Sequence, residues 1–184
     1  MKKIGYIIFL LIVIFSCKND KDLLSIKSMN NDLDSLVSII EEIHINPYYN
    51  YPKKSFYKKI DSVKSSLIKP LNKIEFINII MPIVARLNDG HTEFYKPYNV
   101  FYDKNPWIFP YNVETNNTYP YIRISEGIGE IPINSEILSI NGINSESIIS
   151  KLLKYESGED ISFRAKWVAY NFDYYLNTTS NRNV

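Results

Sequence analysis

The stretch Leu87-Asn88-Asp89-Gly90-His91-Thr92-Glu93-Phe94 follows an apolar helical segment and brings an acid, a histidine and a hydroxyl together in the chain. Before it, apolar residues recur at helical spacing from Ile74 to Leu87. Asn72 and Glu75 have the spacing of a capping box at the start of this helix. The pattern predicts a helix that leads directly into a loop suited to chemistry.

Gly90 is expected to end this helix by taking the left-handed conformation. His91 would then lie just past a helix C-terminus, where the helix dipole favours imidazolium. Taken alone, a histidine near a helix end is more often a cap or a packed surface residue than a catalyst. The local pattern therefore leaves a structural and a catalytic role open for His91.

The motif Leu-x-Asp-Gly-His-Thr resembles the one that ends the N-terminal helical region of tail-specific serine peptidases, the C-terminal-processing, tricorn-core-like family. The resemblance implies that His91 is the general base to a serine, with Asp89 and Thr92 shaping its loop. It also implies a peptide or protein substrate and no cofactor.

The N-terminal residues have the features of an export signal. Lys2 and Lys3 precede an apolar run of residues 4–15, and Ser16 is a small residue before a cleavage point. The run is too short for a permanent transmembrane helix. Residues 14–17, Ile-Phe-Ser-Cys, resemble a bacterial lipobox, which implies lipidation of Cys17. The alternative is an ordinary signal peptide followed by an incidental cysteine.

These features predict a lipoprotein signal peptide at 1–16, and a lipidated Cys17 with a polar tether at 17–28. The protein is expected in the bacterial cell envelope, lipid-anchored to a membrane, on the periplasmic or outer-surface face. Cys17 is the single cysteine, so the chain cannot form an internal disulfide. Lipid attachment would account for a single cysteine in an exported protein.

Composition limits the possible functions. The chain has 184 residues and 45% hydrophobic content, enough for a globular core. Its 21 basic and 20 acidic side chains give a net charge of +1, so nothing indicates a polyanion-binding surface. Nucleic acid is not an expected partner.

Residues 29–100 are expected to form a helical domain of three helices. Leu33 to Ile43 and Phe56 to Leu67 each carry an apolar stripe, with Lys53, Lys54, Lys58 and Lys59 on the outside of the second helix. The third helix contains Pro82, which predicts a kink or a local break near Asn78.

His44 is the other histidine of the chain, and it follows the first helix. Its grouping with Asp89, His91 and Glu93 as a metal site lacks the spacing typical of zinc ligands, so no metal site is predicted. The turn that follows His44, with Asn-Pro-Tyr, resembles one in the same peptidase family. This resemblance implies that His44 helps to orient the turn.

Residues 101–184 show strand periodicity followed by helix. Phe109, Tyr111 and Val113 alternate with polar or small residues, and a similar alternation after an Asn116-Asn117 turn predicts a hairpin with aromatic cross-strand pairs. A second strand at 133–140 meets Asn141-Gly142, a strong turn signal. Asn144 or Ser145 can then cap a helix whose buried residues are Ile148, Ile149, Leu152 and Leu153.

This strand-turn-helix stretch resembles the PDZ-like insert of the tail-specific peptidases. In that fold an extended peptide adds beside a sheet edge, and backbone amides hold its carboxylate. The resemblance directs attention to Gly127 and Gly129 as candidate peptide-binding positions. A plain turn is the commoner role for two nearby glycines.

A last helix is predicted from Asp160, with Phe163, Trp167, Tyr170 and Tyr174 along one face. An aromatic stripe of this kind normally lies in the hydrophobic core, and these residues are predicted to be buried there. Beyond it, residues 177–184 form a polar tail.

The expected fold class is therefore α+β, with an N-terminal three-helix region followed by an incomplete PDZ-like β/α region at 101–184. No Gly-x-Ser-x-Gly elbow occurs in the chain, and Ser157-Gly158 is the nearest fragment. The chain resembles the N-terminal portion of a serine peptidase, a hydrolase active in proteolysis, and is expected to be inactive alone. It could be a truncated copy, a non-enzymatic peptide-binding surface lipoprotein, or a subunit completed by another chain; the first is favoured.

Overall fold

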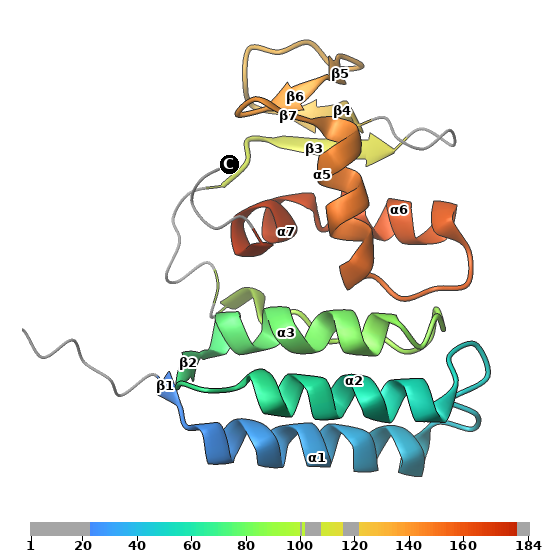
Figure 1. The fold of residues 1–184 in the computed structure, drawn as a ribbon. Coiled ribbons are helices and arrows are strands. Elements are labelled where there is room, and N and C mark those ends of the chain that lie inside the picture. Colours follow the sequence, from blue (N-terminus) through green and yellow to red (C-terminus); the bar gives the residue numbers. More distant parts are fainter. Residues whose placement is uncertain (1–22, 100, 102–107, 116–121, 180–184) are drawn as a thin grey trace, which may run out of the picture.

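The computed structural model describes residues 23–99, 101, 108–115 and 122–179. Helices and small antiparallel sheets together form an α+β fold, as the sequence predicted. Figure 1 shows the helices of residues 26–85 stacked at one end, the helices of residues 161–179 in the middle and the strands of residues 111–144 at the other end. In the part of the chain described, no helix is long and apolar enough to cross a membrane.

The helical layer is built from α1 (Ile26–Ile43), α2 (Lys53–Ser66) and α3 (Lys73–Ala85). Ser25 caps α1 by accepting a hydrogen bond from Ser28 N. Both bonds of the predicted capping box are present at α3, because Asn72 Oδ1 accepts from Glu75 N and Glu75 Oε2 accepts from Asn72 N. Strands β1 (Leu23–Leu24) and β2 (Leu71–Asn72) pair antiparallel beside this layer.

Helix α3 separates two hydrophobic cores. Phe76, Ile80, Val84 and the following Leu87 pack with α1 and α2, whereas Met81 belongs to the core of the C-terminal half. A helix that is apolar on all sides has to be covered on all sides. α3 is therefore shared between the two halves of the molecule.

Pro82 does not interrupt α3. The helix runs continuously from Lys73 to Ala85, so the local break predicted near Asn78 is wrong. Proline removes one backbone donor and disfavours a helix interior. Its neighbours Ile80, Ile83 and Val84 are all buried, and their packing outweighs that cost.

The C-terminal half contains a three-stranded antiparallel sheet and a small hairpin. The sheet order is β3 (Tyr111–Thr115), β4 (Ile122–Gly127) and β5 (Glu136–Ile137). This confirms the predicted hairpin, in which Val113 lies opposite Ile124. Its turn at 116–117 and the tyrosines at 119 and 121 lie outside the described residues, and Tyr111 faces Gly127 rather than an aromatic residue.

The predicted second strand is divided into β5 and β6 (Ser139–Ile140). Asn141 and Gly142 both have positive φ, 50° and 81°, and connect β6 to β7 (Ile143–Asn144). Two consecutive positive φ values are characteristic of the tight hairpin turn that Asn-Gly favours. Asn144 Oδ1 then accepts from Ser147 N and caps α5 (Ser145–Leu152), as predicted.

The predicted last helix consists of two. After the short 3-10 helix η2 (Leu153–Tyr155), α6 (Ile161–Tyr170) begins at its cap Asp160, and α7 (Phe172–Thr179) follows the buried Asn171. Tyr174 is buried in α7, but the three aromatic residues of α6 are surface residues: Phe163, Trp167 and Tyr170 are 39%, 38% and 79% exposed. The assignment of this stripe to the core is wrong for these three, because Ala165, Val168 and Ala169 form the buried face of α6.

Candidate functional site

The loop that carries His91 begins with a left-handed residue that differs from the predicted one. α3 ends at Ala85, and Asn88 rather than Gly90 takes a positive φ, 50°. Asparagine tolerates this conformation better than most residues. The prediction for Gly90 is wrong, and His91 lies beyond the last helical turn, in which the helix dipole acts.

Gly90 packs closely against the start of α6. A Cβ at this position would lie 3.3 Å from two ring carbons of Phe163 and 3.4 Å from a carboxylate oxygen of Glu159. The backbone N–H of Gly90 also donates to Glu159 Oε2 at 3.3 Å. The loop therefore lies close against the start of α6, where a larger residue would require Phe163 or Glu159 to shift by a few tenths of an ångström.

Asp89 organises the turn itself. Its Oδ1 accepts from His91 N at 2.8 Å, and its backbone carbonyl accepts from Thr92 N at 3.1 Å. The N–H of His91 holds the pKa of the Asp89 carboxyl below its usual value, and the His44 side chain acts in the same direction. Asp89 therefore holds the turn through its side chain and its carbonyl, and Thr92 takes part through its backbone N–H; their role in shaping a catalytic loop stays a prediction.

His44 joins α1 to this loop. Its Nε2 lies 2.5 Å from Asp89 Oδ2, and its Nδ1 accepts from Asn46 N at 3.1 Å. Since Nδ1 is an acceptor here, the donated hydrogen is on Nε2. His44 thus contacts the turn after α1, as expected from the family resemblance, and also contacts Asp89, which was not predicted.

Two further contacts attach the loop to distant parts of the chain. The hydroxyl of buried Ser157 accepts from Asp89 N at 3.1 Å, and Asn50 Nδ2 donates to Asn88 O at 2.8 Å. Ser157 therefore supports the loop backbone from within the protein. Sequence reasoning missed Ser157 and Glu159 as loop supports, because they are 68 and 69 residues away from their partners.

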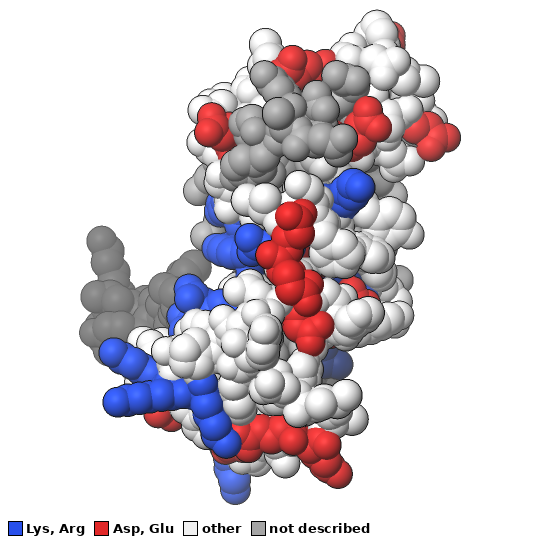
Figure 2. All heavy atoms as spheres, turned by 90° about the vertical axis from the view of Figure 1, so that its right-hand side faces the viewer, with Lys and Arg blue, Asp and Glu red and all other residues white. Residues whose placement is uncertain are grey.

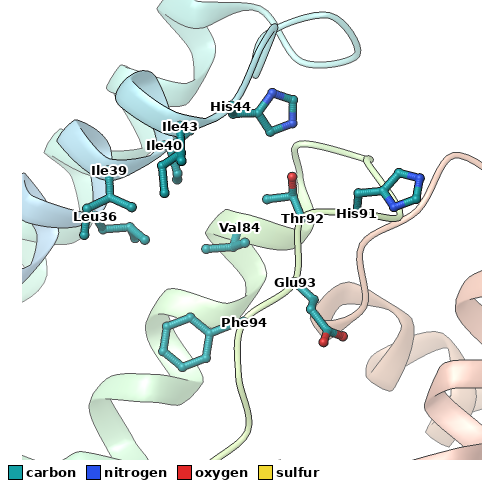
Figure 3. Close-up of a pocket in the computed structure, with 10 residues that line it drawn as sticks. All are labelled: Leu36, Ile39, Ile40, Ile43, His44, Val84, His91, Thr92, Glu93 and Phe94. Carbon is teal, nitrogen blue, oxygen red and sulfur yellow. The ribbon is translucent and has the colours of Figure 1, made fainter.

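The His91 side chain is exposed. Figure 3 shows its ring directed away from the isoleucines of α1, and His44 stands apart from it above Thr92. Within the described residues, the ring of His91 forms no hydrogen bond. Its backbone is held while its imidazole is open to an incoming group.

An apolar pocket of about 330 Å³ lies next to this histidine. Figure 3 shows Leu36, Ile39, Ile40 and Ile43 of α1 on one side and the strand-like segment with Thr92 and Phe94 on the other. Ile39 and Ile43 are 51% and 74% exposed, so this side of the pocket presents an apolar surface to solvent. The polar groups of His44, His91 and Glu93 contribute to the lining.

A buried ion pair underlies the segment that follows the loop. Lys96 Nζ lies 3.2 Å from Glu156 Oε1, and the two side chains are only 6% and 4% exposed. The same oxygen accepts from Tyr175 OH at 2.6 Å and from Asn171 Nδ2 at 3.2 Å. Burial is the main cause that raises the pKa of Tyr175, and the charge of Glu156 adds to it. This network joins Lys96 to Asn171, between α6 and α7, and to Tyr175 of α7 through the carboxylate of Glu156.

The two candidate peptide-binding glycines lie against Tyr111. A Cβ on Gly129 would be 1.8 Å from the Tyr111 hydroxyl, and one on Gly127 would be 2.3 Å from a ring carbon. The Tyr111 hydroxyl also accepts from Ile131 N at 3.2 Å. Packing of this tyrosine accounts for both glycines, and their role in peptide binding stays a prediction.

Cys17 lies outside the described residues. Among the residues that the structure describes, no three or more His, Cys, Asp or Glu side chains are grouped in a way that could hold a metal ion. Comparison of the chain with protein-family models and with curated proteins finds no match.

Proposed function

We propose that this chain is the lipid-anchored N-terminal portion of a tail-specific serine peptidase, with His91 as its general base. The observation that carries the proposal is an exposed imidazole on a tightly held loop. Asp89, Ser157 and Glu159 hold the loop backbone, while the His91 ring has no partner among the described residues. A general base needs a fixed position and an accessible nitrogen.

A serine nucleophile has to come within hydrogen-bond reach of this base, and an oxyanion site is needed as well. Ser157 does not serve as this nucleophile, because its hydroxyl is buried and accepts from Asp89 N. The nucleophile in this proposal belongs to a further α/β domain or to a second polypeptide. The described part alone is expected not to hydrolyse peptides.

The finer proposal for the C-terminal half is a PDZ-like region. It is supported by the antiparallel strands β3 to β5, the β6–β7 hairpin with its Asn-Gly turn, and the capped helix α5. An extended peptide with its carboxylate near Gly127 and Gly129 remains part of this proposal. The proposed location is the bacterial envelope, through a lipid on Cys17.

The second candidate function is peptide binding without hydrolysis. The observation in its favour is the apolar pocket of about 330 Å³ next to His91, with two half-exposed or exposed isoleucines at its opening. Pockets of this size and character suit apolar side chains of a ligand. A non-enzymatic surface lipoprotein could use the pocket to hold an extended peptide.

Sequencing the genomic DNA beyond the codon for Val184, with translation in every forward frame, separates the two candidates. An α/β domain with a Gly-rich serine elbow would support the peptidase. An unrelated gene would favour the peptide-binding protein. Peptide hydrolysis by the chain alone that is lost in His91→Ala would contradict the expected inactivity.

Peptide binding has its own test with a matched pair of variants. A fluorescent extended peptide rich in aliphatic residues is titrated into the full chain, into Ile43→Asn and into Ile68→Asn. Ile43 lines the pocket, whereas Ile68 is exposed elsewhere. Weaker binding only in Ile43→Asn supports the pocket as the binding site, and equal affinities for all three proteins refute it.

A further inference from the structure

A second cleft, of about 610 Å³, lies between the helical layer and the C-terminal half. It is lined by α2 and α3 on one side and by η2 and α6 on the other. Its basic residues are Lys59, Arg86, Lys154 and Arg164, and its lining contains no Asp or Glu. Asparagine side chains at 78 and 88 add polar groups. The site is distinct from the pocket next to His91.

The four cations come from four separate elements that converge on this cleft. Lys59 belongs to α2, Arg86 caps α3, Lys154 lies in η2 and Arg164 lies in α6. None of them forms an ion pair with a carboxylate of the described residues; Lys154 Nζ instead lies 4.9 Å from the Tyr155 ring centre. Like charges gathered in one cleft repel one another, so an anion between them would be stabilised.

Lys59 is partly buried in the cleft and lacks an ionic partner among the described side chains. The sequence assigned it to the outside of α2 with Lys53, Lys54 and Lys58, but the structure leaves Lys59 half-buried and its neighbour Lys58 exposed. A lysine loses solvation when it is partly buried, and an ionic partner restores favourable interactions. No such partner is present among the described side chains.

Arg164 supports the same conclusion. Its Nε is buried and has no hydrogen-bond partner in the described structure. Asp160 lies near enough for its charge to interact with Arg164, but its carboxylate already caps α6 by accepting from Ser162 N and Phe163 N. The planar guanidinium is suited to a phosphate group, whose oxygens accept several hydrogen bonds at once.

We propose that this cleft binds a doubly charged oxyanion of the phosphate class, either hydrogen phosphate or a phosphomonoester. Figure 2 shows basic side chains gathered at mid-height on the left, next to a column of acidic side chains. The site does not depend on the proposed peptidase function.

The test is a calorimetric titration of the full chain, held in non-ionic detergent at neutral pH and low ionic strength, with inorganic phosphate. Two matched pairs of charge-removing variants are compared: Lys59→Gln with Lys58→Gln, and Arg164→Gln with Lys166→Gln. The members of each pair are close in sequence, but only Lys59 and Arg164 line the cleft. Thermal unfolding of each variant checks that it is folded.

The cleft variants are expected to bind phosphate about tenfold more weakly, the effect of losing one hydrogen bond to a charged group. The control variants should stay within about twofold, because exposed charges are screened. A parallel titration with glycerol phosphate distinguishes an organic phosphomonoester from inorganic phosphate as the ligand. Tighter binding than that of the inorganic ion assigns an organic phosphomonoester, and equal affinity assigns the free ion.

Two results would overturn the proposal. One is the absence of a binding heat with phosphate beyond that seen with sodium chloride at the same ionic strength. The other is a loss of affinity in Lys58→Gln and Lys166→Gln as large as in their partners, which would indicate non-specific attraction to net charge.

Discussion

The Nε2 atom of His44 lies 2.5 Å from Oδ2 of Asp89, and this contact joins the end of α1 to the loop that carries His91. Forty-five residues separate the partners in the sequence. The side chains are 20% and 22% exposed, so the contact is largely shielded from water. One histidine of the chain therefore supports the loop, while the other presents its ring to solvent.

His44→Ala should lower the free energy of unfolding by about 1.5–3 kcal/mol, the usual range for a hydrogen bond to a charged group. His91→Ala is the matched control, because its ring is exposed, and it should change stability by less than about 0.5 kcal/mol. Urea denaturation of both variants measures the difference. Equal losses of stability would show that the His44–Asp89 contact does not support the fold.

Asp89 should make the free energy of unfolding depend on pH in the acid range. The pKa of the Asp89 carboxyl is lowered in the folded protein, mainly by the N–H of His91. Its contribution to the free energy of unfolding is therefore fully present above the ordinary pKa of 3.8 and is lost as the pH falls through the folded pKa. Asp89→Asn keeps an oxygen for the N–H of His91 but removes the charge. Its unfolding free energy should therefore fall less steeply between about pH 5 and pH 2.

The dependence of the unfolding free energy on pH should be reduced in Asp89→Asn rather than abolished. Glu41 still contributes to it, because a hydrogen bond from Lys53 is the main cause that lowers the Glu41 pKa to about 2. Asp61→Asn serves as the control because Asp61 is exposed on α2. An unchanged slope in Asp89→Asn would contradict the assignment of acid sensitivity to this loop.

Removal of one member of the buried Lys96–Glu156 pair should be costly. Lys96→Met leaves the carboxylate of Glu156 buried with only neutral partners, and a loss of about 3–5 kcal/mol in unfolding free energy is expected. The comparison is Lys64→Met, which breaks the surface pair with Asp34 and should cost no more than about 1 kcal/mol. Chemical denaturation of both variants gives the two values.

Replacement of both buried partners, Lys96→Met with Glu156→Leu, should recover part of the stability because no unpaired charge remains. A double variant less stable than Lys96→Met alone would mean that Glu156 is held mainly by Tyr175 and Asn171.

Gly129→Ala should destabilise the sheet by overpacking against Tyr111, at a cost of about 1–3 kcal/mol. A second change, Tyr111→Ala, removes the ring and should make the glycine substitution nearly neutral. A double-mutant cycle of unfolding free energies measures this coupling. Additive effects would show that Tyr111 does not require the glycine.

Much of the secondary structure was predictable from local sequence. The capping box at Asn72 and Glu75, the Asn141-Gly142 turn and the cap at Asn144 all act over three or four residues, and each is present. The errors arose where local preference competed with packing. Asn88 rather than Gly90 takes the left-handed conformation, while Gly90 packs closely against Phe163 and Glu159.

The aromatic residues of α6 were misassigned because Ala165, Val168 and Ala169 form its buried face, and Tyr174 belongs to a separate helix after a turn at Asn171. The buried side chain of Asn171 donates to Glu156 and to Trp167 O, and a new helix begins after it. Periodicity counted through this position places Tyr174 with Phe163 and Trp167, although only Tyr174 is buried. Nothing near Asn171 in the sequence indicates its distant partner.

The sequence by itself determined the mixed helical and strand composition, the caps at Asn72 and Asn144 and the Asn141-Gly142 turn, because these depend on contacts within a few residues. Only the tertiary structure decided that His44 contacts Asp89, that Ser157 and Glu159 hold the loop, and that four cations line one cleft. These contacts join residues far apart in the chain. Their partners are selected by how the two halves pack on α3, which no local pattern encodes.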